Sequence, residues 1–132
     1  MKEITRINHL GIRVRDLATS RAFYEKLGFV FLAGPFGPEP VAVMEHPSGI
    51  NINFILNAGD DASTENLLMD VLEKHTGITH VALEISSRDA VRAQLEALGI
   101  PITETVDLPD GTQFFFVRDP DGNVIELHSP GK

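Results

Sequence analysis

An internal repeat constrains the fold of this chain more than any other feature of its sequence. Residues 7–14, Ile-Asn-His-Leu-Gly-Ile-Arg-Val, match residues 78–85, Ile-Thr-His-Val-Ala-Leu-Glu-Ile, and this match aligns His9 with His80. Further on, residues 46–54 match residues 119–127 and align Asn53 with Glu126. Self-similarity of this kind is typical of a duplicated supersecondary unit. The sequence therefore predicts two copies of one module.

Each copy has the pattern of a strand, a helix and three further strands. Alternating apolar residues predict a first strand over 5–14 and its mate from residue 78, and both predicted helices are closed by a Leu-Gly pair, Leu27-Gly28 and Leu98-Gly99. The first helix is expected over 19–27, and the second opens at Ser86 or Ser87. The later strands are expected near 29–33, 41–46 and 50–57, and near 101–106, 113–118 and 123–128. The fold class is thus α+β, built from two βαβββ modules.

The chain of 132 residues is long enough for a single domain over 1–132. Its parts are module one over 4–57, a linker over 58–77 with a short amphipathic helix, and module two over 78–129. A net charge of −8 argues against nucleic acid and anionic membranes as partners. With no cysteine in the chain, a metal would be held by His, Asp, Glu, Asn or backbone oxygen. Without a signal peptide or an apolar span, we expect a cytoplasmic protein.

The polar side chains of the predicted strands gather on one face. Because strand side chains alternate, His9 and Arg13 share a face, and so do Glu126 and His128, while Leu10, Ile12 and Val14 face a helix. Two imidazoles and one carboxylate suit a divalent transition metal, so His9, His80 and Glu126 are the candidate ligands. A sheet face exposed to solvent would show the same alternation, and strand pattern alone does not separate the two interpretations.

Several motifs together resemble the vicinal oxygen chelate superfamily, which includes glyoxalase I, extradiol dioxygenases and bleomycin-binding proteins. They are Asn8-His9-Leu10, Arg15-Asp16-Leu17, Phe23-Tyr24 before Leu27-Gly28-Phe29, Thr79-His80-Val81-Ala82, and Asp119-Pro120-Asp121-Gly122 leading to Ile125-Glu126-Leu127. The resemblance covers nearly the whole chain. It implies two modules that form a curved mixed-sheet cup with the helices outside, a small-molecule substrate and a homodimer. In some members, modules of two different chains complete the site.

Within that superfamily the chain is most similar to glyoxalase I. The resemblance implies that Arg13 binds a carboxylate of a substrate such as a glutathione hemithioacetal and that Asn57 also contacts this substrate. His128, two residues beyond Glu126 on the same strand face, is a candidate to support Glu126 or to bind the substrate. Asn53 stands where a glutamate ligand is expected. Proton transfer would then fall to Glu126 alone, with the metal as a Lewis acid. Nickel, zinc, cobalt, manganese and iron all suit these ligands.

Two other functions remain open at this point. Two histidines and one glutamate also suit an Fe(II) ring-cleaving dioxygenase, although the tyrosine of the extradiol signature is Phe116 here. The second alternative is a non-catalytic protein that binds a drug or another small molecule. A fosfomycin thiol transferase fits less well, because Gly11 replaces the threonine of that family, and an epimerase acting on a coenzyme A thioester stays open.

Overall fold

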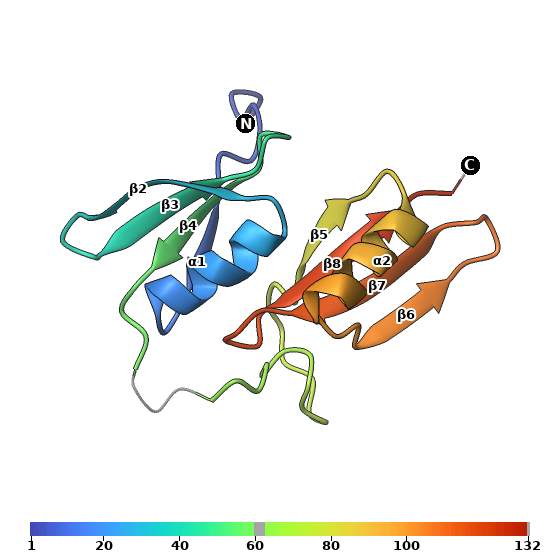
Figure 1. The fold of residues 1–132 in the computed structure, drawn as a ribbon. Coiled ribbons are helices and arrows are strands. Elements are labelled where there is room, and N and C mark those ends of the chain that lie inside the picture. Colours follow the sequence, from blue (N-terminus) through green and yellow to red (C-terminus); the bar gives the residue numbers. More distant parts are fainter. Residues whose placement is uncertain (60–62, 132) are drawn as a thin grey trace. The chain divides into compact units, whose positions relative to one another are not determined.

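The computed structural model describes residues 1–59 and 63–131, which fall into two compact units, Met1–Ala62 and Ser63–Lys132. Each unit is one βαβββ module with a four-stranded mixed sheet, and one helix lies across a face of that sheet (Figure 1). The predicted α+β class and the two-module architecture are confirmed. Residues 60–62 of the predicted linker lie outside the described residues. No described helix is long and apolar enough to cross a membrane.

The first module has the strand order β1-β4-β3-β2, in which β1 runs parallel to β4 and the other neighbours are antiparallel. Tyr24 of the helix packs against Phe54 of the sheet with ring centroids 5.3 Å apart, and both side chains are buried. Asp16 caps the helix by accepting a hydrogen bond from the Thr19 amide. The elements of this module are β1 (Leu10–Arg13), α1 (Leu17–Lys26), β2 (Val30–Phe36), β3 (Val41–Glu45) and β4 (Asn51–Ile55).

The second module repeats this topology with the order β5-β8-β7-β6. Its core contains Leu95, Phe115 and Ile125, all at most 2% exposed. Ser87 caps the second helix, and Gly99 closes it in the left-handed conformation, as the sequence predicted. The elements are β5 (Val81–Glu84), α2 (Arg88–Leu98), β6 (Glu104–Asp107), β7 (Gln113–Arg118) and β8 (Val124–Ser129).

Two sequence predictions about local structure are wrong. The first strand of module one is shorter than the predicted 5–14, because β1 begins only at Leu10 where it pairs with β4. The amphipathic helix expected in the linker is absent from its described part, residues 63–77. There the side-chain oxygen of Asn66 accepts hydrogen bonds from the amides of Leu68 and Met69. These bonds stabilise a local turn instead of the repeating backbone hydrogen bonds of a helix.

The described linker residues are tied to module two. Asn66 donates from Nδ2 to the carbonyl of Gly122 at 3.2 Å, and Arg118 donates to Asp70 at 3.1 Å. Arg118 also pairs with Glu104 at 2.9 Å, and its side chain is only 16% exposed. This segment is therefore held by a charged network in addition to a backbone contact.

The Asp70 contact predicts a pH-dependent stability. The hydrogen bond from Arg118 lowers the pKa of Asp70 below its ordinary value of 3.8, against the opposing effect of burial. A carboxyl whose pKa is lowered by folding stabilises the native state above its unfolded pKa, and this contribution is lost as the pH falls through the folded value. We expect Asp70→Asn to lower the free energy of unfolding at neutral pH. In urea titrations the difference from wild type should shrink as the pH is lowered through the acid range below the ordinary aspartate pKa of 3.8. A difference that persists there would contradict the assignment.

Candidate metal and substrate site

The strand registers confirm the internal alignment of the two modules. Asn53 lies opposite Gly11 on β1 and Val43 on β3, and Glu126 lies opposite Ala82 on β5 and Phe116 on β7. Asn53 and Glu126 therefore occupy equivalent places in equivalent sheets. One module presents an amide where the other presents a carboxylate.

In module two, the structure brings three of the predicted site residues together. Nε2 of His80 lies 2.9 Å from Oε2 of Glu126, and Nδ1 of His128 lies 2.7 Å from Oε1 of the same carboxylate. The Glu126 side chain is 9% exposed, while those of His80 and His128 are 31% and 34% exposed. A nearly buried carboxylate is thus held between two imidazoles that reach the surface.

Aromatic rings fix the orientation of both imidazoles. The ring of His128 stacks on Phe114 at an interplanar angle of 9°, and the ring of His80 meets the edge of Phe116 with centroids 5.5 Å apart. Nδ1 of His80 lies 2.8 Å from the Thr79 hydroxyl, so the Nε2 side of the ring points to Glu126. The face away from α2 therefore presents a rigid polar cluster within an apolar surround.

The donor set of His80 and Glu126 fits a divalent metal. An imidazole nitrogen and a carboxylate oxygen lie side by side here, 2.9 Å apart, and both are ligand types that divalent transition metals take. A hydrogen-bonded Nδ1 is also the usual arrangement for a histidine that binds a metal through Nε2. Within residues 1–59 and 63–131 no three His, Asp or Glu side chains are grouped as a metal site. The fit therefore rests on this pair.

The third predicted ligand, His9, belongs to module one. It lies directly before β1, as His80 lies directly before β5, and its Nδ1 is 2.9 Å from the Asn8 side-chain oxygen. His9 is exposed, and Asn53 on the neighbouring strand is half-buried. The structure thus brings His80, Glu126 and His128 together in module two, whereas His9 and Asn53 belong to module one.

Module one contains a second polar cluster at the ends of β1 and β4. Nε of Arg13 donates to Oδ1 of Asn57 at 2.8 Å, and Nδ2 of Asn57 donates to Oε1 of Glu39 at 2.8 Å. A guanidinium nitrogen of Arg13 lies 3.7 Å from the same Glu39 oxygen. Arg13 and Asn57 were predicted from the sequence, whereas Glu39 was not. The sequence around Glu39, Pro38-Glu39-Pro40, is typical of an ordinary turn, so it did not indicate a residue of a binding cluster.

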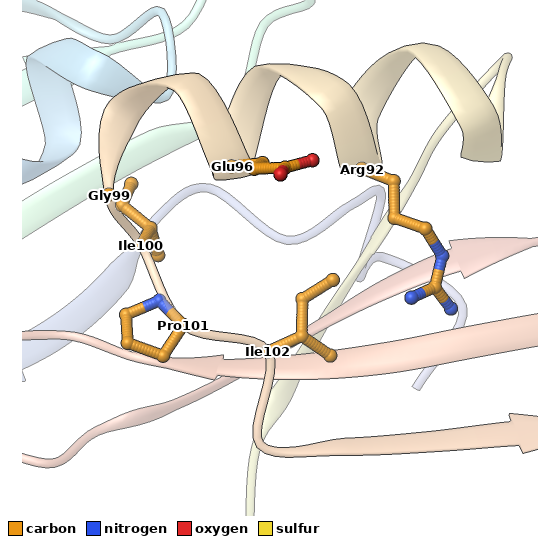
Figure 2. Close-up of a pocket in the computed structure, with 6 residues that line it drawn as sticks. All are labelled: Arg92, Glu96, Gly99, Ile100, Pro101 and Ile102. Atoms are coloured by element: carbon orange, nitrogen blue, oxygen red, sulfur yellow. The ribbon is translucent and has the colours of Figure 1, made fainter.

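A separate hollow lies on the opposite face of module two. Figure 2 shows it between the C-terminal half of α2 and the segment that follows, with a volume of about 410 Å³. It is lined by Arg92, Glu96, Gly99, Ile100, Pro101 and Ile102. The guanidinium of Arg92 lies over the ring of Phe115, on the helix side of the sheet. No candidate site residue lines this hollow, so its shape says nothing about the His80–Glu126 cluster.

Two known proteins are similar to this chain in sequence. The chain is 28% identical over 128 residues to the Bacillus subtilis protein called "Uncharacterized protein YwbC", with 92% of this chain and 95% of that protein covered. It is 27% identical over 144 residues to lactoylglutathione lyase of Schizosaccharomyces pombe, covering 92% of this chain and 44% of that enzyme. The chain therefore spans less than half the length of that lyase.

A solved structure shows the same fold. It is a glyoxylase/bleomycin resistance protein/dioxygenase domain from Frankia sp. EAN1pec, which superposes with a TM-score of 0.75 at 22% identity over 98% of this chain and 94% of that one. The family model for the glyoxalase/bleomycin resistance protein/dioxygenase superfamily matches residues 6–127. The chain belongs to this superfamily, the vicinal oxygen chelate proteins.

Proposed function

We propose that this protein is a metal-dependent, glyoxalase-I-like lyase or isomerase that acts on a small oxygen-chelating substrate, such as a glutathione hemithioacetal. His9, His80 and Glu126 are the proposed metal ligands. The metal, when bound, supplies a Lewis acid for the substrate oxygens. Nickel, zinc, cobalt, manganese and iron all suit this ligand set.

The observation that carries the choice of reaction is the hydrogen bond between Arg13 and Asn57. These two residues lie far apart in the sequence, and the fold joins them at 2.8 Å. A guanidinium beside a side-chain amide is suited to a substrate carboxylate, which a peptide-like thiol such as glutathione would provide. Phe116 supports the same choice, because its ring lies against His80 but carries no hydroxyl for the proton transfers of ring cleavage.

The chemistry assigned to the chain's own residues is proton transfer by Glu126. Its carboxylate takes the carbon-bound proton of the substrate and returns it to the neighbouring carbon. His128 holds one carboxylate oxygen, Oε1, and the other, Oε2, lies beside His80. Oε2 would alternate between binding the metal and accepting the substrate proton. Asn53, at the equivalent place of module one, is an amide and is assigned to substrate binding. The proposal includes a cytoplasmic location and a homodimer, since members of this superfamily often form dimers.

Assay of thioester formation from methylglyoxal and glutathione tests this function. The protein is first stripped with a chelator and then loaded separately with each of the five metals. Turnover that depends on the added metal is expected with at least one of them. Absence of turnover with all five, together with oxygen uptake on catechols after anaerobic iron loading, would move the assignment to the dioxygenase. Unchanged ligand affinity in His9→Ala and Glu126→Ala would favour a binding protein without catalysis.

A further inference from the structure

The carboxylate of Glu39 contacts Arg13 and Asn57, the two residues that would bind a ligand carboxylate. We propose that Glu39 is a specificity-determining residue whose carboxylate is an internal competitor, so that a ligand carboxylate reaches Arg13 only by displacing it. This inference rests on the proposed function in taking Arg13 and Asn57 as the carboxylate-binding pair. It adds a residue that weakens the binding of anionic ligands and thereby selects among them.

The backbone around Glu39 presents its side chain at a fixed place. The turn between β2 and β3 contains Gly37 with a φ of +88°, followed by Pro38, Glu39 and Pro40. The amide of Leu56 donates to the carbonyl of Pro40 at 2.9 Å, which ties the turn to the end of β4 beside Asn57. Because proline restricts both its own φ and the residue before it, Glu39 loses little backbone freedom on making its contacts.

The contacts of Glu39 are those of a bound carboxylate. Its Oε1 accepts a hydrogen bond from Nδ2 of Asn57 and lies 3.7 Å from Nη2 of Arg13. Asn57 is thereby engaged at both ends, since its Oδ1 accepts from Nε of Arg13. A ligand carboxylate that approached the Asn57 amide and the Arg13 guanidinium would meet the negative charge of Glu39.

The exposure of the pair makes Glu39 a competitor that ligands can displace. The Arg13 and Glu39 side chains are 57% and 52% exposed, and ion pairs of this kind are weak in water. Replacing the carboxylate by an amide removes both the internal partner of Arg13 and the repulsion of an incoming anion. We expect this to tighten binding of a carboxylate ligand by up to about fivefold at low salt, and less as salt screens the charges.

Isothermal titration calorimetry with S-hexylglutathione, a non-reacting thioether, tests the inference by measuring the dissociation constant of this thioether. The proteins compared are wild type, Glu39→Gln, Arg13→Gln and the control Glu25→Gln, which removes a carboxylate paired with Arg21 at 2.6 Å in the same module. Tighter binding is expected only for Glu39→Gln, with the gain shrinking at higher salt. The gain should also be absent for the diamide of the same thioether, in which both carboxylates are neutral.

The other outcomes separate this inference from the proposed function. In one outcome, Glu39→Gln binds the ligand no more tightly than wild type, while Arg13→Gln binds it more weakly. This result would show that Glu39 is not a competitor, and it would leave the proposed function standing. Binding that responds to neither substitution, or that none of the four proteins shows, overturns the carboxylate role of Arg13 and the inference with it.

Discussion

Glu126→Gln is expected to reduce metal-dependent turnover by about 10²- to 10⁴-fold, the usual contribution of a positioned general base. The amide keeps the size of the side chain and its place between His80 and His128, but it has no carboxylate to accept a proton. It is also a weaker metal ligand than a carboxylate, so bound metal measured by elemental analysis should fall. Turnover and metal content of the purified variant, measured side by side, test both expectations.

Glu96→Gln is the matched control for this variant. Glu96 lies on α2 beside the hollow in Figure 2, on the helix side of the same module, and it is exposed. The control should match wild type in turnover and metal content. Far-UV circular dichroism should show that both variants are folded. A Glu126→Gln protein with wild-type turnover would remove Glu126 from the reaction, and the proposed mechanism would be wrong.

The fold was predictable from the sequence because its signals are local and occur twice. The capping residue Ser87 and the left-handed Gly99 act within one turn of α2, and the alternation of each strand reflects burial on one side of a sheet. The short helix in the linker was predicted wrongly because the conformation of this segment depends on partners distant in the sequence. Asn66 reaches Gly122, and Asp70 reaches Arg118. The pattern of apolar residues within 63–77 does not indicate these distant contacts.

For the candidate site, the sequence predicted which side chains share a strand face, but not which of them touch. Strand alternation placed Glu126 and His128 on one face, and the structure shows both beside each other there. Strand alternation did not predict that His128 would contact the carboxylate of Glu126, because this contact depends on side-chain rotamers. Glu39 was missed for a related reason. Its contact with Asn57 depends on how the turn between β2 and β3 folds back onto the end of β4.

Gly122→Ala is expected to cause a large loss of stability. Gly122 has a φ of +81°, and a Cβ built there would lie 1.8 Å from the carbonyl oxygen of Thr64. The obstacle is backbone of the linker, which cannot rotate away as a side chain would. Left-handed strain on a non-glycine residue costs about 1–2 kcal/mol, and displacing the linker should bring the total loss in unfolding free energy to about 3–4 kcal/mol.

Gly49 offers a matched control in the equivalent turn of module one. Its φ is +95°, no described atom would lie within 4 Å of its added Cβ, and its amide donates to His46 as that of Gly122 donates to Asp119. Gly49→Ala should therefore cost only the left-handed strain, about 1–2 kcal/mol. Urea unfolding followed by circular dichroism gives both losses, and limited proteolysis should cut 63–70 faster in Gly122→Ala alone. Equal losses and equal cleavage would mean that Thr64 does not hold this turn in solution.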